Sequence, residues 1–273
     1  MKTKAAVGLI LGLATAMAAR AQEPPSLTFG EVARFRSEVL GEERRINVLL
    51  PPGYGGSQER YPVLYLLDGS AHDDYFHSAS LIDYLATYEA MPATIVVGIS
   101  NVDRRRDFTL PSTDPKDRES APTSGGAGKF LRFLETELIP YVESHYRTAG
   151  TRTLLGQSLA GLLATQVLLE KPVLFDQYVI VSPSLWWDQQ SLLSRAAALL
   201  REHRTPKRAI YLSVGEEHPE MVETAKRLAG LLRAEPWEGQ RFCFQFLANE
   251  NHATAHHVSL YRAMEFLYRG RCP

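Results

Sequence analysis

The sequence predicts an α/β fold: a mostly parallel central sheet with an N-terminal antiparallel hairpin and helices on both faces. Three observations predict it. Short apolar runs alternate with amphipathic helical patterns along most of the chain, as in a parallel sheet wrapped by helices. Residues 61–67 form a continuous apolar run, which is typical of a central strand. At 273 residues and 45% hydrophobic, the chain can bury a large core.

The strand-like and helix-like runs follow one another in order. Residues 31–37 and 44–50 predict the opening hairpin, and the turn-forming segment 51–56 ends it. After the central strand at 61–67, we expect strands at 94–99, 153–155, 178–181, 209–214 and 241–247. Helical patterns occupy residues 81–90, 128–146, 162–170, 189–204, 220–234 and 258–268. No repeat or low-complexity tract interrupts the pattern, so we expect a single domain over residues 22–273.

Residues 1–21 predict a secretory signal peptide. Lys2 and Lys4 precede an apolar run over residues 5–18, which ends at Ala19-Arg20-Ala21. The run is short and rich in alanine and glycine, so we expect no membrane span. Cleavage before Gln22 leaves a periplasmic or secreted chain with 27 of the 30 basic residues, all 31 acidic residues and a formal charge of −4.

The segment around Ser158 predicts a nucleophile elbow. An apolar strand ends at the small residue Gly156, the serine follows two places on, and helix-like sequence begins at once. Such a sharp turn projects the serine oxygen above the edge of the sheet and needs small flanking residues. The usual G-x-S-x-G pattern has become G-x-S-x-A, with Ala160 in place of glycine and Gly161 one residue later. A helix that merely begins with a capping serine is the alternative.

A hydroxyl nucleophile needs a base, and His252 is the candidate. It lies between the last expected strand and the last expected helix, where the base of a hydrolase triad occurs. His256 and His257 fall inside that helix, where we expect them to face solvent or to pack against the sheet.

The acid that orients the base should follow its own strand, between the serine and the histidine in chain order. Glu216 and Glu217 come directly after the strand at 209–214, and we prefer Glu217, with Glu216 as the alternative. Two solvated carboxylates at the start of a helix, or a Ser-His dyad with no acid, remain open as interpretations.

The oxyanion of an acyl-transfer reaction needs two backbone N–H donors. The residue after the nucleophile, Leu159, would supply one, and Ser70 or Gly69, after an early strand, would supply the other. The alternative is that Asp68-Gly69 only marks a turn.

Substrate contacts are expected from side chains at the carboxyl ends of the strands. Asp68 and Gln157 stand at two such ends. Arg104 and Arg106 lie in a polar loop over residues 101–128 that could clamp an anionic ligand, or they belong to a solvated charge run. Trp186 and Trp187 could stack on an aromatic acyl group or could pack in the core.

Several function classes are not supported by the composition. The chain is not basic and carries no nucleic-acid-binding module, and no metal-binding motif or cofactor fingerprint is present, so we expect no nucleic acid, metal or cofactor. Cys243 and Cys272 are the two cysteines, and export would allow them to form a disulfide. The oligomeric state is not encoded in any pattern that we recognise.

Five segments together resemble the putative-esterase family of α/β-hydrolases, which includes siderophore trilactone esterases, S-formylglutathione hydrolase, feruloyl esterases and mycolyltransferases. The resemblance is greatest to the periplasmic siderophore esterases. It implies an α/β-hydrolase fold, with Ser158 as nucleophile and His252 as base. The segments are Tyr61-Pro62-Val63-Leu64-Tyr65-Leu66-Leu67-Asp68-Gly69, Asp103-Arg104-Arg105-Arg106-Asp107, Gly156-Gln157-Ser158-Leu159-Ala160-Gly161-Leu162, Ser182-Pro183-Ser184-Leu185-Trp186-Trp187 and Asn251-His252.

The resulting hypothesis is an exported serine carboxylic-ester hydrolase that acts on small-molecule esters through an acyl-enzyme, with siderophore lactones or aromatic acyl esters as substrates. An acyltransferase of the same fold and a non-catalytic ligand-binding relative are the alternatives. Three departures from the family pattern bear on efficiency and on the acid: Ala160, the Ala253-Thr254 pair after the histidine, and His218 near the position where some relatives carry a carboxylate.

Overall fold

The computed structural model describes residues 28–272. The expected signal peptide lies outside these residues. Within them, no helix is both long and apolar enough to cross a lipid bilayer.

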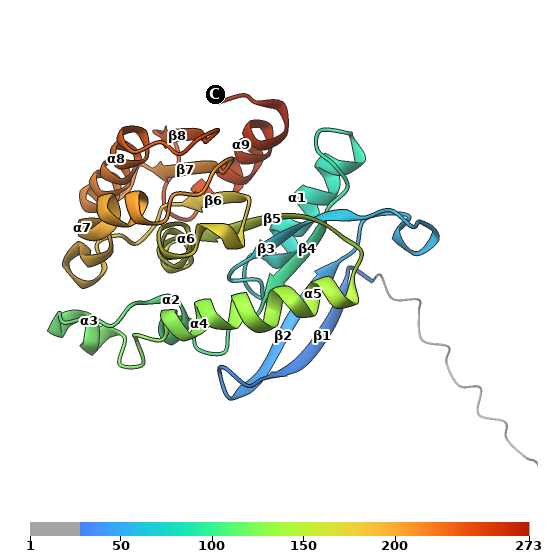
Figure 1. The fold of residues 1–273 in the computed structure, drawn as a ribbon, viewed down its shortest axis with the longest axis horizontal. Coiled ribbons are helices and arrows are strands. Elements are labelled where there is room, and N and C mark those ends of the chain that lie inside the picture. The colour runs from blue at the N-terminus through green and yellow to red at the C-terminus, as the bar shows by residue number, and fades with distance from the viewer. Residues whose placement is uncertain (1–27, 273) are drawn as a thin grey trace, which may run out of the picture.

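An eight-stranded sheet in the order β1-β2-β4-β3-β5-β6-β7-β8 organises the fold (Figure 1). The β1–β2 and β2–β4 pairs are antiparallel, and every other neighbouring pair is parallel. The mostly parallel sheet with an N-terminal hairpin is therefore confirmed. The strands are β1 (Glu31–Ser37), β2 (Glu42–Leu49), β3 (Tyr61–Leu66), β4 (Ile95–Ile99), β5 (Thr148–Gln157), β6 (Gln177–Val181), β7 (Ala209–Gly215) and β8 (Arg241–Leu247).

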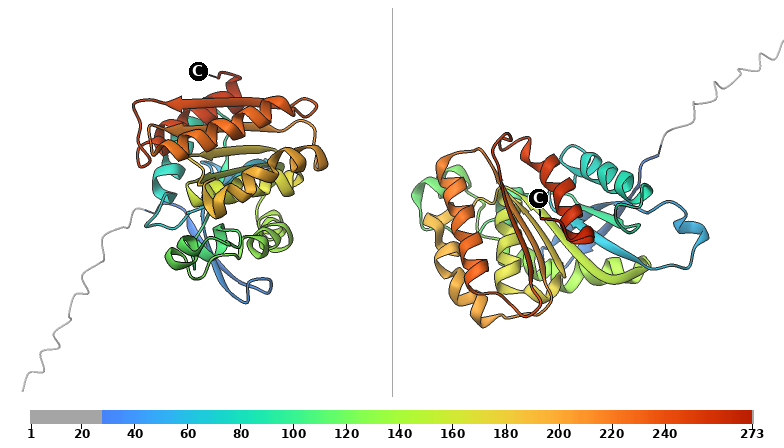
Figure 2. Two further views of the ribbon diagram at one scale, coloured as in Figure 1. Left: turned by 90° about the vertical axis from the view of Figure 1, so that its left-hand side faces the viewer. Right: turned by 90° about the horizontal axis from the view of Figure 1, so that it is seen from above.

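Helices cover both faces of the sheet, as expected (Figures 1 and 2). One face carries α1 (Tyr75–Thr87) and α9 (Ala255–Arg269), whose buried residues pack with Leu64 and Leu66 of β3. The alternate residues Val63 and Tyr65 belong to the core on the other face, because side chains along a strand point to opposite sides. That face is covered by α4 (Ala127–Phe133), α5 (Ile139–His145), α6 (Leu159–Glu170), α7 (Trp187–Glu202) and α8 (Pro219–Ala234).

Two expectations about local structure need correction. The helix expected at residues 81–90 begins six residues earlier, because Tyr75 and Ser78 are buried in its first turn against the sheet and α9. The segment expected as a polar loop contains two short helices, α2 (Arg104–Phe108) and α3 (Pro115–Ser120). Asp103 and Asp114 cap them by accepting hydrogen bonds from backbone N–H groups of the first turn.

The two cysteines form a disulfide between β8 and the segment after α9. Cys243 is buried in the sheet core, and its Cα lies 5.6 Å from that of Cys272. The bridge fixes the C-terminal segment to the last strand of the sheet.

Candidate active site

Ser158 stands at the sharp turn between β5 and α6, with backbone angles of φ 61° and ψ −121°. This is a strained conformation for a residue with a side chain, so the surroundings must hold it. The Ser158 N–H donates to the Val181 carbonyl at 3.1 Å, and the Ser158 carbonyl accepts from the N–H groups of Ser184 and Leu162. The elbow is therefore locked to the end of β6 and to the first turn of α6.

The small residues of the elbow are required by close backbone approaches. A Cβ on Gly156 would lie 2.4 Å from the Ala160 carbonyl oxygen, and a Cβ on Gly161 would lie 2.9 Å from the Val181 carbonyl oxygen. Ala160 itself is fully buried with its methyl group near Gly156. The turn thus requires glycine at positions 156 and 161 and accommodates a methyl group at position 160, which accounts for the departure from G-x-S-x-G.

His252 and Glu217 form a hydrogen-bonded contact at the carboxyl ends of β8 and β7. His252 Nδ1 lies 2.7 Å from Glu217 Oε2. The other carboxylate oxygen, Oε1, accepts from the Gly215 N–H at 3.1 Å and from the Ser182 hydroxyl. Burial by itself would raise the pKa of Glu217, but the hydrogen bonds from His252, Ser182 and Gly215 outweigh it and hold the pKa below its usual value. The carboxylate is therefore ionised and fixed at neutral pH.

The backbone around His252 is tied to neighbouring segments. Gln157 donates a side-chain hydrogen bond to the His252 carbonyl. The Asn251 side-chain oxygen accepts from the N–H groups of Ala253 and Thr254 and shapes the turn after the histidine. These contacts hold the backbone segment that carries the imidazole ring.

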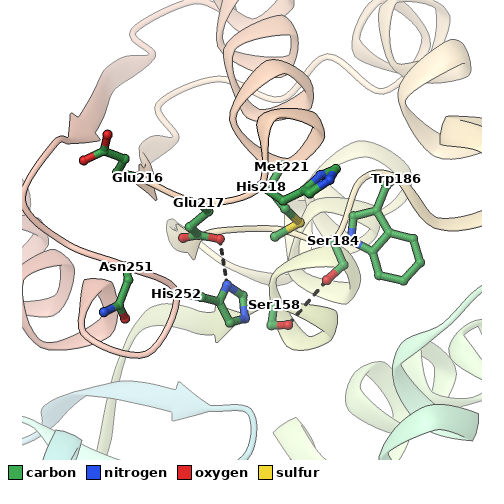
Figure 3. A pocket seen from close by; sticks show the side chains of 9 residues that line it. All are labelled: Ser158, Ser184, Trp186, Glu216, Glu217, His218, Met221, Asn251 and His252. Carbon is green, nitrogen blue, oxygen red and sulfur yellow. Dashed lines mark hydrogen bonds and ion pairs between the residues drawn. The ribbon is translucent and has the colours of Figure 1, made fainter.

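Ser158, Glu217 and His252 line one cavity of about 400 Å³, which we call the tryptophan cavity (Figure 3). Figure 3 shows the second ring nitrogen of His252 on the side that faces Ser158. The Ser158 hydroxyl lies 3.4 Å from the Ser184 hydroxyl, its one side-chain hydrogen bond within residues 28–272. The other residues that line this cavity are Ser184, Trp186, Glu216, His218, Met221 and Asn251.

Of the two candidate acids, the geometry favours Glu217. Glu216 is exposed, and Figure 3 shows its carboxylate directed away from His252. His218 caps α8 instead, where its ring nitrogen accepts from the Glu220 N–H at 3.4 Å. Two adjacent carboxylates point in different directions here, so their roles could not be separated by sequence alone.

The three candidate oxyanion donors come from two places in the chain: Leu159 from the start of α6, and Gly69 and Ser70 from the segment after β3. Leu159 is the first residue of α6, directly after the serine. The Gly69 N–H donates to the Ile99 carbonyl at 2.9 Å, so Gly69 is not available as an oxyanion donor, contrary to one of our two suggestions. A Cβ on Gly69 would lie 2.3 Å from the backbone of β4, which explains the glycine. Ser70 remains the candidate, and its hydroxyl accepts from the Asn101 N–H at 3.3 Å.

A second cavity, of about 360 Å³, also reaches Ser158 and His252. We call it the charged cavity; the rest of its lining is Asp68, Asp74, Arg104, Gln157 and Ala253. Asp68 and Arg104 bind each other through two hydrogen bonds of 2.7 and 2.8 Å. The expected substrate contacts Asp68, Arg104 and Gln157 are therefore brought beside the serine.

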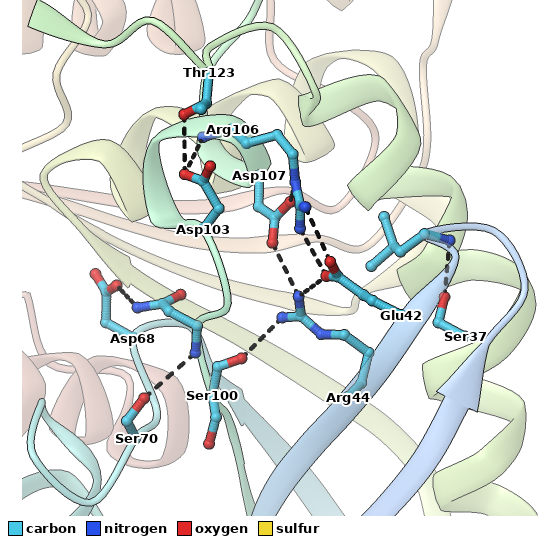
Figure 4. Close-up of polar contacts among 12 residues, drawn as sticks. Ser37, Glu42, Arg44, Asp68, Ser70, Ser100, Asp103, Arg106, Asp107 and Thr123 are labelled. Atoms are coloured by element: carbon cyan, nitrogen blue, oxygen red, sulfur yellow. Dashed lines mark hydrogen bonds and ion pairs between the residues drawn. The ribbon is translucent and has the colours of Figure 1, made fainter.

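Arg106 and Trp187 do not lie where we expected. Arg106 binds Glu42 through two hydrogen bonds of 2.9 and 2.7 Å and also binds Asp107 (Figure 4). The fully buried Arg44 joins the same carboxylates, so Arg106 belongs to a structural ion-pair network and lines neither cavity. Trp187 is buried and donates from its indole nitrogen to the Leu110 carbonyl, so Trp186 is the tryptophan of the cavity.

Six lining residues were not among the predicted site residues: Ser184, His218, Met221, Asn251, Asp74 and Ala253. Ser184 lies in the Ser182–Trp187 segment, of which only the tryptophans were expected to contact a substrate. Met221 and Asp74 lie near the first turns of α8 and α1, and only the packing of these helices against the sheet brings them to the site.

The neighbouring histidines have other partners. His256 is buried and its Nε2 lies 2.9 Å from the hydroxyl of the fully buried Ser78. Burial lowers the pKa of His256 to about 4, so the ring is neutral at physiological pH. His257 is exposed and its Nδ1 lies 3.0 Å from His77 Nε2. In the described part of the chain, no group of three or more His, Cys, Asp or Glu side chains is arranged to hold a metal ion.

Comparison with known proteins places this architecture in a family. Residues 37–263 match the family model described as Putative esterase. The ferri-bacillibactin esterase BesA of Bacillus subtilis is 33% identical over 227 residues, which cover 76% of this chain and 78% of the relative. An IroE-like serine hydrolase from Shewanella oneidensis has a similar structure, with a TM-score of 0.80, 31% identity and coverage of 88% of this chain and 80% of the other. The BES protein from Bacillus cereus aligns with a TM-score of 0.79 at 27% identity, covering 92% and 98%. The α/β-hydrolase fold is thus confirmed, and the chain belongs to the putative-esterase family of ester hydrolases.

Proposed function

We propose that this ester hydrolase is a serine esterase that works through an acyl-enzyme. Ser158 attacks the ester carbonyl carbon, and His252 Nε2 accepts the serine proton. The resulting oxyanion is stabilised by the backbone N–H groups of Leu159 and Ser70. The ester C–O bond then breaks, His252 returns its proton to the departing alcohol, and an acyl group remains on Ser158.

Water completes the cycle in the second half-reaction. His252 accepts a proton from the attacking water, the oxyanion forms again, and collapse releases the carboxylic acid and free Ser158. Glu217 stays ionised throughout, holds the imidazole with its proton on Nδ1, and stabilises the imidazolium that forms twice per turnover. The depressed pKa of Glu217 suits this role.

One observation carries the proposal: the strained serine and the carboxylate-bound histidine line the same cavity, with the free ring nitrogen on the serine side. A purely structural serine at a helix start would need neither the positive φ angle nor an ordered imidazole beside it. The accommodated methyl group of Ala160 also removes the reason to regard the elbow as defective.

The test is a pair of single variants. Ser158→Ala should abolish hydrolysis of a short-chain p-nitrophenyl ester and covalent labelling by a fluorophosphonate, while the circular dichroism spectrum stays unchanged. Ser184→Ala, which removes the neighbouring hydroxyl, serves as the matched control and should still be labelled. Turnover in Ser158→Ala equal to that of the parent enzyme would refute the assignment.

For the substrate, we propose siderophore lactones or esters of aromatic acids. The support is the family membership, the names of relatives such as the ferri-bacillibactin esterase, and Trp186 and Met221 in the tryptophan cavity, which offer an apolar surface to an acyl group. A hydrolysis screen over simple aryl esters, feruloyl esters and ferric or iron-free trilactones tests this proposal, and added alcohol acceptors reveal whether acyl transfer competes with hydrolysis.

We also propose that the protein works in an oxidising compartment, the periplasm or the medium. The Cys243–Cys272 disulfide supports this, since such bonds persist outside the reducing cytosol. Mass determination of protein from the periplasmic fraction, with the expected N-terminus at Gln22, tests the proposed export.

A further inference from the structure

The charged cavity beside the nucleophile contains a carboxylate that the proposed mechanism does not use. Asp74 stands just before α1 and lines this cavity together with Ser158 and His252. No residue that the structure describes donates a hydrogen bond to its carboxylate, and the nearest ionisable nitrogen, His256 Nδ1, is 4.0 Å away. This carboxylate is free to bind a group from outside the protein.

The charge of the cavity is set by three side chains. Arg104 was the expected anion clamp, but its Nε and Nη2 both donate to Asp68, and Asn101 also donates to Asp68 at 2.6 Å. With that pair neutralised, Asp74 leaves the cavity with a formal charge of −1. Among the described residues that line this cavity, the one cationic side chain, Arg104, is paired with Asp68, so an entering anionic group meets the unpaired carboxylate of Asp74.

We propose that Asp74 makes the charged cavity a subsite for the alcohol half of the ester, selecting alcohols that carry a cationic or hydroxyl group and rejecting anionic ones. The inference rests on the proposed function, because it assumes acylation at Ser158. The tryptophan cavity, with Trp186 and Met221, offers the complementary apolar surface for the acyl half.

The selectivity should depend on pH. Burial, followed by the nearby carboxylates of Asp68 and Asp73, raises the pKa of Asp74 to about 6, although Arg104 opposes the shift. His256, which faces Asp74 from α9, is neutral in this range because its pKa lies near 4. Asp74 is therefore ionised above pH 6 and neutral below it, so discrimination by charge should be strong at pH 7.5 and weak at pH 5.

The test uses three benzoate esters with different alcohols: choline (cationic), ethylene glycol (neutral) and glycolate (anionic). For each ester, kcat/KM of Asp74→Asn is divided by that of the parent enzyme, which cancels the intrinsic reactivity of the ester. At pH 7.5 we expect the choline-to-glycolate preference to fall roughly 30-fold in Asp74→Asn, since one unit charge acts at contact distance in a partly solvated site. In the parent enzyme the same preference should decline as the pH falls through 6.

Two further variants keep the inference refutable. Asp73→Asn removes the same charge from the adjacent residue, which lines neither cavity, and should change the preference less than threefold. Asp74→Glu keeps the charge and should restore most of the preference. The subsite would be overturned if Asp74→Asn changed kcat/KM equally for all three esters. It would also be overturned if Asp73→Asn and Asp74→Asn changed the choline-to-glycolate preference by the same factor.

The outcomes also separate this inference from the proposed function. If Ser158→Ala is inactive but the choline-to-glycolate preference is the same in the parent enzyme and in Asp74→Asn, the subsite is wrong and the esterase mechanism stands. If Ser158→Ala hydrolyses all three esters, the mechanism itself fails. If Asp74→Asn changed kcat/KM for esters charged on the acyl half, and not for esters charged on the alcohol half, the assignment of the alcohol half to this cavity would be wrong.

Discussion

Replacing Glu217 by glutamine or by alanine should impair the enzyme to different degrees, and the order of the two variants tests the arrangement of the site. His252 Nδ1 lies 2.7 Å from Glu217 Oε2. In the proposed mechanism the carboxylate holds the proton on Nδ1 and leaves Nε2 free to accept the serine proton. In Glu217→Gln, the amide oxygen can keep the bonds from Ser182 and the Gly215 N–H, which places the amide NH₂ against His252. Two donors then face each other unless the imidazole adopts the other tautomer, in which Nε2 carries the proton and is not a base.

The magnitude follows from the exposure of the ring. Trapping the wrong tautomer in a buried triad costs about 10⁴ in kcat. The His252 side chain is 48% exposed, so water competes with the amide, and we expect a loss of about 10³, or about 4 kcal/mol, for Glu217→Gln. Glu217→Ala leaves room for a water that can accept from Nδ1–H, and its loss should be nearer 10², or about 3 kcal/mol.

The assay is kcat for a p-nitrophenyl ester at pH 7.5, with circular dichroism to verify the fold. The exposed Glu216→Gln is the matched control and should stay within twofold of the parent enzyme. If Glu217→Ala proves as slow as or slower than Glu217→Gln, the tautomer argument is wrong. If both variants remain within threefold of the parent enzyme, Glu217 is not the acid and the site functions as a dyad.

Three other predictions concern stability and the elbow. The disulfide closes a loop with a sequence separation of 29, so Cys272→Ser, which leaves Cys243 unpaired, should lower the free energy of unfolding by about 3.5 kcal/mol in urea titrations; an unchanged midpoint would contradict the bridge. Ala160→Gly should lower stability by about 1 kcal/mol through helix propensity and leave kcat within threefold, whereas a tenfold increase would show that the methyl group hinders the elbow. Because the folded-state pKa of Glu217 is depressed, its stabilising contribution should be complete above about pH 5 and should disappear as the pH falls below its ordinary value of 4.5. The difference in unfolding midpoint between the parent enzyme and Glu217→Gln, measured from pH 7 to pH 3, tests this last point.

The long elements of the fold could be predicted because their signal is local. A strand such as β7 is buried along its whole length and is mostly apolar, and α8 repeats its buried residues with helical spacing. The short helices α2 and α3 were missed, because a helix of five or six residues is marginal by itself and depends on caps and ion pairs. The early start of α1 was missed for a similar reason, since the burial of Tyr75 and Ser78 stabilises its first turn.

The sequence by itself predicted the order of the candidate site: an elbow serine, then a carboxylate after one strand, then a histidine after the last. These are local features, because each residue is tied to the end of its own strand, and parallel strands bring their carboxyl ends to one edge. The choice between adjacent candidates was decided only by the tertiary structure. Glu217 and Glu216, Trp186 and Trp187, and Ser70 and Gly69 are neighbours with similar local signals, and they differ only in the partners that other segments place against them. The charge of the second cavity was likewise a tertiary property, because it depends on Asp68 binding Arg104 and on the packing that brings Asp74 into the same cavity as Ser158.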